Sequence, residues 1–196
     1  SIIIPTRNMR DLLARCIESI RARTTYPNFE IIVVDNGSDD PATLEYLNNL
    51  VKERIAKVIR SDGPFNFSAL NNLAVANANG EILALLNNDL EVISPDWLDE
   101  MVSHACRPDI GAVGARLWYP NDTLQHGGVI LGVGGKVGHP LQHAGVVLGF
   151  CAIACHAHKK LKRGEPGYFG RAALLQSFSA VTAACMMMPR RVFEEI

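Results

Sequence analysis

The sequence lacks the features that mark a nucleic-acid-binding or membrane-spanning protein. Aromatic residues make up only 7% of the 196 residues, and 19 basic side chains are balanced by 20 acidic ones, for a net charge of −1. No strong basic field is therefore available to attract nucleic acid. The longest weakly polar stretch, residues 172–188, is interrupted by polar side chains and is too short and polar for a membrane span.

Cysteine is also scarce, and the common phosphate-binding signatures are absent. The five cysteines are scattered and odd in number, which predicts reduced thiols and a cytoplasmic setting. The chain opens on an apolar segment without a charged leader, so we expect no secretory signal. Neither G-x-G-x-x-G nor G-x-x-x-x-G-K-[ST] occurs, which disfavours a dinucleotide-binding Rossmann site and a P-loop.

Apolar strands alternate with amphipathic helices through the first half of the chain. This alternation is typical of an α/β fold with a mostly parallel, doubly wound sheet that helices cover on both faces. We expect a single domain, with a ligand-binding half at 1–98 and a looser half at 99–196. The predicted strands are 2–4, 29–34, 56–60, 82–86 and 110–119, and the predicted helices are 12–23, 42–53, 68–78 and one capped by Ser94, with Met186–Met188 in the core.

Polar residues follow three of these strands, at 5–8, 35–40 and 87–89. In open α/β sheets, ligands bind outside the carboxyl ends of the strands. Asn87 and Asp89 carry oxygen ligands of the kind that a divalent cation prefers. The alternative is a polar turn ahead of the next helix.

Four sequence blocks, taken together, resemble the family-2 glycosyltransferases, which have a GT-A fold. These blocks are residues 1–8, residues 32–39, Asn71 in a helix before Gly80, and residues 86–89. From residue 111 onward the chain is similar to a bacterial, rhamnosyltransferase-like subgroup, through residues 125–128, 167–170, 180–185 and 190–196.

The resemblance implies an inverting glycosyltransferase of bacterial surface-polysaccharide synthesis. Its donor would be a UDP-, dTDP- or GDP-linked sugar, its acceptor a saccharide or a lipid-linked molecule, and its cofactor Mg²⁺ or Mn²⁺. Asp35 would accept a hydrogen bond from the base, which suits a carboxylate. The residues implied are Pro5, Thr6, Asn8, Asp35, Asn71 and Asn88 for the nucleotide, and Asp89 with Asn87 for the cation.

The sequence departs from the family pattern at several positions. Asn87 stands where many relatives have an acid, Leu70 where they often have an arginine, and Arg7 where they often have an aromatic residue. The family's catalytic base follows the segment that ends here, so we expect it beyond Ile196. The substitutes within the chain would be the loop carboxylates Asp122 and Glu165.

Two other functions stay open, together with several features of the second half. The alternatives are a sugar-nucleotide pyrophosphorylase and a non-catalytic nucleotide-binding module. Residues 159–163 form a basic run that is solvated or meets a lipid phosphate or the inner face of a membrane. We also expect the fragment to self-associate through uncovered apolar surface. Residues 124–132 recur at 141–149, and Cys151, Cys155, His156 and His158, with His139 and His143 nearby, lack the spacing of a known zinc finger.

Overall fold

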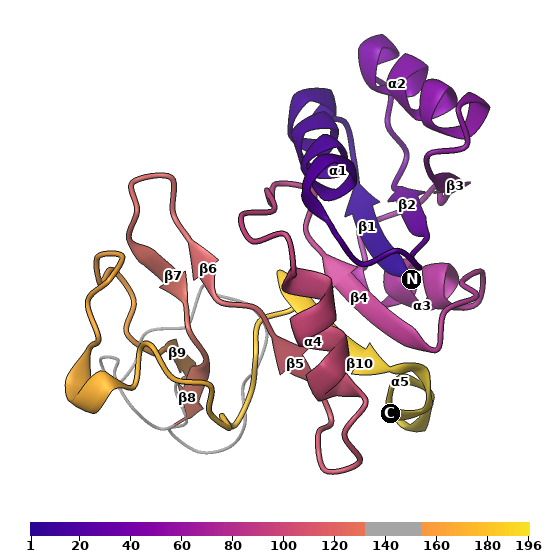
Figure 1. The fold of residues 1–196 in the computed structure, drawn as a ribbon. Coiled ribbons are helices and arrows are strands. Elements are labelled where there is room, and N and C mark those ends of the chain that lie inside the picture. Colours follow the sequence, from indigo (N-terminus) through magenta and orange to yellow (C-terminus); the bar gives the residue numbers. More distant parts are fainter. Residues whose placement is uncertain (132–153) are drawn as a thin grey trace. The chain divides into compact units, whose positions relative to one another are not determined.

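The computed structural model describes residues 1–131 and 154–196, and the chain forms two compact units. Unit 1 consists of residues 1–113 and 183–196, and unit 2 of residues 114–182 (Figure 1). Residues 99–113 and 183–196, which we assigned to the second half of the chain, therefore lie with the first half.

Unit 1 contains a six-stranded sheet in the order β3-β2-β1-β4-β10-β5. The strands β1, β2, β3 and β4 run parallel, and β10 pairs antiparallel with β4. This arrangement confirms the predicted mostly parallel α/β fold. The strand bounds are β1 Ile2–Thr6, β2 Ile31–Asp35, β3 Lys57–Arg60, β4 Ile82–Leu86, β5 Val113–Gly114 and β10 Cys185–Pro189.

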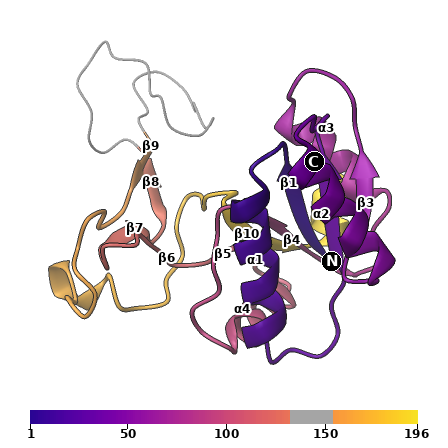
Figure 2. The same ribbon diagram turned by 90° about the horizontal axis from the view of Figure 1, so that it is seen from above.

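Helices cover both faces of this sheet. The chain moves from β1 to β2 to β3 in one direction and then returns to β4, so right-handed crossovers place α1 and α2 on one face and α3 on the other. Accordingly α1 contacts α2, and α3 packs on β1 and β2 (Figure 2). The helix bounds are α1 Arg10–Arg23, α2 Pro41–Lys52, α3 Phe67–Val75, α4 Trp97–Ala105 and α5 Arg190–Glu195.

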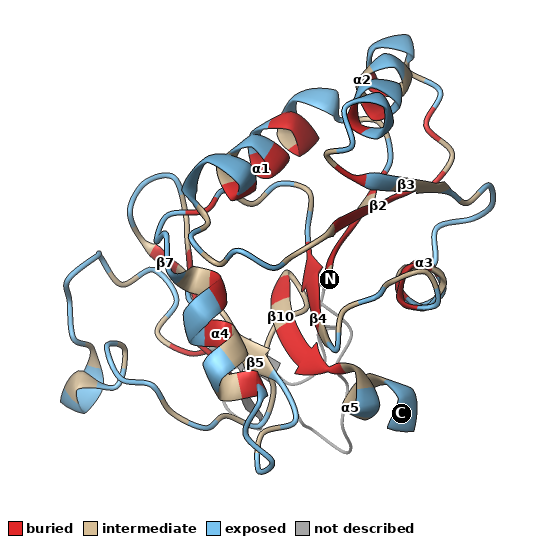
Figure 3. Cartoon of the chain, turned by 45° about the vertical axis from the view of Figure 1, so that its right-hand side comes forward, coloured by how far each residue is buried: buried red, intermediate tan, exposed pale blue. Residues whose placement is uncertain are grey.

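The core of unit 1 lies where the central strands meet these helices. Ile3, Ile32 and Leu83 are fully buried, with exposed fractions of 0%, and they pack in one cluster with α3. Figure 3 shows the same burial along β4 and β10. Continuous apolar strands of this kind are typical of a parallel sheet that is covered on both faces. Met187 and Met188 on β10 are buried as predicted.

The largest differences from the predicted elements concern α4, α3 and the strand at 110–119. Helix α4 begins at Trp97, and Ser94 contributes only its carbonyl oxygen, which accepts the Trp97 N–H at 3.3 Å. Helix α3 ends at Val75 because the next residues tighten into turns with i−3 hydrogen bonds. The predicted strand at 110–119 is two short strands, β5 and β6 (Leu117–Trp118), in different sheets.

Unit 2 contains two small antiparallel sheets in the part that the structure describes. Its elements are β6 Leu117–Trp118, β7 Leu124–His126, β8 Val129–Leu131, β9 Ala154–His156 and the 3₁₀ helix η1 Tyr168–Gly170. The second copy of the repeat (141–149), His139, His143 and Cys151 lie outside the described residues. Across residues 1–131 and 154–196, no helix has the length and apolarity needed to span a membrane.

Candidate functional site

The candidate site lies at the carboxyl edge of the sheet, between β1 and β4. These neighbouring strands continue to opposite sides of the sheet, which makes the gap between them a topological switch point, the usual ligand position in open α/β sheets. Thr6 ends β1 and is 4% exposed. Its Oγ1 accepts a hydrogen bond of 3.0 Å from the Asn88 side-chain amide, which follows β4.

The strand register extends this site into a row of three residues. Thr6 lies opposite Asp35, and Asp35 lies opposite Arg60 at the end of β3. Asp35 as a whole residue is 2% exposed, and its carboxylate accepts two hydrogen bonds of 2.9 Å, from the Ser38 N–H and from the Arg60 guanidinium. Arg60 also donates to Asp62 at 2.8 Å. The sequence analysis missed Arg60, although it ends a strand just as Asp35 does.

Asn8 fastens the loop after β1 to the loop after β2. Its backbone N–H donates to the Ser38 hydroxyl at 2.7 Å, and its Oδ1 accepts the N–H groups of Asp39 and Asp40, each at 3.1 Å. Asn8 and Met9 both adopt positive φ angles, 54° and 56°. Such left-handed backbone is uncommon outside glycine and clusters at functional sites. The local fold therefore holds this loop in one costly conformation.

Two buried amide oxygens beside this edge lack a hydrogen-bond partner among the described residues, namely Oδ1 of Asn36 and Oδ1 of Asn71. Both residues are 2% exposed. Their amide nitrogens are engaged, because Asn36 donates to the carbonyls of Ser61 and Gly63 and Asn71 donates to Phe67. Unpartnered buried acceptors are rare in folded proteins. A ligand N–H or O–H group that reached these oxygens would be favoured.

The predicted cation ligands follow β4, and both side chains are exposed. The backbone N–H of Asn87 donates to the Ala184 carbonyl at 2.9 Å, which fixes the first residue of this turn against the segment before β10. Asp89 offers a single carboxylate. No group of three metal-binding side chains occurs among the described residues. One carboxylate and one amide oxygen are the kind of ligands that a hard cation such as Mg²⁺ takes when a bound molecule and water supply its remaining oxygens.

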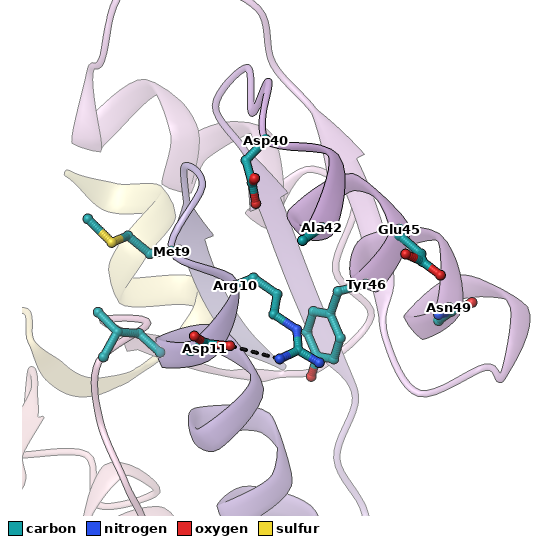
Figure 4. Close-up of a pocket in the computed structure, with 9 residues that line it drawn as sticks. Met9, Arg10, Asp11, Asp40, Ala42, Glu45, Tyr46 and Asn49 are labelled. Carbon is teal, nitrogen blue, oxygen red and sulfur yellow. Dashed lines mark hydrogen bonds and ion pairs between the residues drawn. The ribbon is translucent and has the colours of Figure 1, made fainter.

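A hollow of about 690 Å³ lies between the start of α1 and helix α2. Its walls carry three carboxylates, from Asp11, Asp40 and Glu45, against the single cation of Arg10 (Figure 4). Arg10 lies over the ring of Tyr46, 5.7 Å from its centroid. Burial, followed by the charge of Glu18, raises the pKa of Tyr46 to about 12, so the phenol stays neutral. The net negative charge of the lining disfavours a diphosphate ligand here.

The structure thus brings together only part of the predicted set of residues. Thr6 and Asn88 are in direct contact, and Asn8 reaches Asp35 through Ser38. Pro5 is half-buried within β1, opposite Val34. Among the described residues, no hydrogen bond links Asn71, Asn87 or Asp89 to this group. In unit 2, Asp122 is paired with Arg163 at 2.7 Å and Glu165 accepts the Lys162 N–H.

Comparison with known proteins shows relatives along the whole chain. The chain is 47% identical over 197 residues to the uncharacterized protein y4gI of Sinorhizobium fredii, and it covers 20% of that protein. It is 40% identical over 197 residues to the O-antigen biosynthesis protein RfbC of Myxococcus xanthus, of which it covers 14%. The chain therefore spans less than a quarter of the length of these two relatives.

A solved structure and a family description agree with these relatives. The mannosyltransferase PcManGT of Pyrobaculum calidifontis, solved in complex with GDP-Man and Mn²⁺, matches with a TM-score of 0.53 and 25% identity, over 62% of this chain and 36% of that one. The family described as glycosyl transferase family 2 matches residues 1–196. The fold, the relatives and this match together establish that the chain belongs to glycosyl transferase family 2.

Proposed function

We propose that this chain binds the donor of an inverting glycosyltransferase that works in bacterial surface-polysaccharide synthesis. The donor is a nucleoside-diphosphate sugar with uracil, thymine or guanine as its base, and the acceptor is a saccharide or a lipid-linked molecule. Family membership and the name of the Myxococcus relative support this proposal. The GDP-Man and Mn²⁺ in the Pyrobaculum structure support a nucleotide-sugar donor and a divalent cation.

The observation that carries the proposal is the contact of Asn88 with Thr6 at the switch point. It joins the ends of the two strands between which a ligand is expected. We assign base recognition to Asp35 and the orphaned amide oxygen of Asn71 to the base or ribose. Pro5, Thr6 and Asn8 form the floor of the nucleotide pocket.

We assign cation binding to Asp89 and Asn87. A bound Mg²⁺ or Mn²⁺ would neutralise the diphosphate as the sugar leaves. The neutral amide of Asn87 makes this a site with one protein carboxylate, so we expect weak cation binding in the absence of nucleotide.

Inversion also requires a carboxylate that takes the proton of the acceptor hydroxyl. We assign this role to none of the described carboxylates. Asp122 and Glu165, the two candidates from the sequence, are engaged by Arg163 and by the Lys162 N–H. The family match disfavours the pyrophosphorylase alternative. A nucleotide-binding module without activity would share the donor site, and only an activity assay of a longer protein separates it from an enzyme.

Calorimetric titration tests the donor site. The chain is titrated with UDP, dTDP and GDP, each with and without Mn²⁺, beside the variants Asp89→Ala and Asp109→Ala. We expect one diphosphate to bind in the presence of Mn²⁺, with binding more than about tenfold weaker in Asp89→Ala because a cation ligand is lost.

The control variant removes an exposed carboxylate whose ion-pair partner in the described part of the chain is Arg107, so it should bind like the parent chain. The proposal fails if no diphosphate binds to the folded chain. The cation assignment fails if Asp89→Ala retains the full Mn²⁺ dependence.

A further inference from the structure

Exposed apolar side chains are concentrated in one short segment of unit 2. Isolated exposed apolar residues are normal on a protein surface, whereas a cluster of them marks an interaction site. The cluster lies on η1 and the loop that follows it. Its members and their exposed fractions are Tyr168 73%, Phe169 82%, Leu174 64% and Leu175 73%.

The same part of unit 2 carries a local excess of positive charge. Residues 157–175 contain the cations Lys159, Lys160, Lys162, Arg163 and Arg171 and a single acidic residue, Glu165, although the whole chain has a net charge of −1. Within the described residues, the three lysine side chains make no hydrogen bond or ion pair, so their ammonium groups are available to a partner.

Direct packing holds the basic run against the apolar segment. Gly167, at a φ of 67°, approaches both so closely that an added Cβ would lie 3.0 Å from Leu161 and 3.0 Å from Ala172. A small hollow of about 220 Å³ is lined by residues 161–165, Ala172 and Ala173, and also by Arg116, Trp118 and Leu124. The two features therefore form one surface, which we call the 159–175 surface.

We propose that the 159–175 surface docks on an anionic lipid bilayer. Aromatic and leucine side chains enter the interface between headgroups and acyl chains, while neighbouring lysines are attracted to anionic headgroups. A second copy of the chain fits this surface poorly, because a two-fold contact would bring two like-charged patches together. The inference extends the proposed function by naming the surface that brings the chain to a lipid-linked acceptor.

Vesicle flotation without any sugar nucleotide tests this surface separately from the donor site. The full chain is mixed with vesicles of phosphatidylcholine alone or of phosphatidylcholine with phosphatidylglycerol, at low and high salt. We expect binding to the anionic vesicles only, and weaker binding at high salt because surface charges are screened.

Two variants separate the contributions of charge and of apolar insertion. Each lysine near an anionic surface strengthens binding about fivefold, so a variant with Lys159, Lys160 and Lys162 all changed to Gln should bind about a hundredfold more weakly. Phe169→Ser with Leu175→Ser should also lose binding. The matched controls are Lys52→Gln and Phe65→Ser in unit 1, where Phe65 is 67% exposed, and both should bind like the parent chain.

Several results would overturn the proposal. These are a folded parent chain that ignores anionic vesicles, 159–175 variants that bind as well as the controls, and competition by inorganic phosphate that abolishes binding. A further contradicting result could come from light scattering. If the parent chain is oligomeric and Phe169→Ser with Leu175→Ser makes it monomeric, the surface is an interface between copies instead.

Discussion

Asp35 illustrates how a single buried charge is held at the edge of the sheet. Its side chain is 3% exposed, and its partner Arg60 is 47% exposed. A buried carboxylate is costly without partners, and here the Ser38 N–H and the Arg60 guanidinium supply two. These two bonds leave the carboxylate with unused acceptor capacity. Arg60 therefore orients the side chain to which we assign base recognition.

Loss of Arg60 should destabilise the fold. Hydrogen bonds to charged groups contribute about 1.5–3 kcal/mol, and the half-exposed guanidinium reduces this, so Arg60→Gln should lower the free energy of unfolding by about 1–2 kcal/mol. Urea denaturation measures this difference.

Arg107→Gln is the matched control, because both partners of its ion pair are exposed. The Arg107 side chain is 53% exposed and the Asp109 side chain is 61% exposed. This control variant should cause no measurable decrease in the free energy of unfolding. Equal losses in the two variants would show that burial of Asp35 contributes nothing to the strength of its ion pair.

Among the helices, the observed caps differ from the one that we predicted. Helix α3 begins after Asn66, whose side chain accepts the Ala69 N–H at 3.0 Å. Helix α2 is capped by Asp40 in the same way, with Pro41 in its first turn. Helix α4 has no side-chain cap, and Ser94 lies too far ahead of its first turn. A Ser-Pro-Asp sequence therefore indicated that a helix follows but not the residue at which it begins.

Substitution of the Asn66 cap and of Ser94 tests which of these residues stabilises its helix. Asn66→Ala should lower the free energy of unfolding by about 1 kcal/mol, because the Ala69 N–H loses its acceptor. Ser94→Ala should leave it unchanged, and thermal unfolding followed by circular dichroism compares the two variants. A comparable loss in Ser94→Ala would mean that Ser94 acts as the cap in solution.

The residues of the candidate site come from one continuous part of the sequence, whereas the unit that contains them is built from two separate segments. All the residues to which we assign donor binding lie between Pro5 and Asp89, within unit 1. Unit 1 is nevertheless completed by β10, which comes from residues 185–189 and pairs with β4. Unit 2 is thus inserted between two segments of unit 1.

We predict that unit 1 folds and binds nucleotide without unit 2. Residues 115–181 are replaced by a short Gly/Ser linker, which is long enough because β5 and β10 are neighbouring strands, about 4.8 Å apart. Cooperative unfolding and Mn²⁺-dependent binding within about tenfold of the parent chain are expected, a difference of about 1.4 kcal/mol.

The contrasting variant removes residues 183–196 instead. It should fail to fold cooperatively, because the apolar residues of β4 lose the strand that pairs with them. If the linker variant is folded but binds no nucleotide, unit 2 contributes to the donor site. The predicted self-association of the chain stays a prediction.

Local patterns in the sequence predicted the strands β1 to β4 and the helices α1 to α4 of unit 1 and the positions of its polar strand ends, whereas β10 and α5 were not predicted. An apolar run followed by a polar residue is a pattern of residues that are adjacent in the sequence. This pattern was sufficient to predict that Thr6, Asp35 and Asn88 lie at one edge of a sheet. The four sequence blocks also identified the family.

Only the tertiary structure decided which of these residues touch. Strand register joins residues that are distant in the sequence, which is why Arg60 was missed as the partner of Asp35 and why the contact of Asn88 with Thr6 spans 82 positions. The same non-local pairing brings β10 into the sheet beside β4. The pattern of apolar and polar residues within one segment does not predict such a contact. The contact contributes free energy only once the two strands have paired.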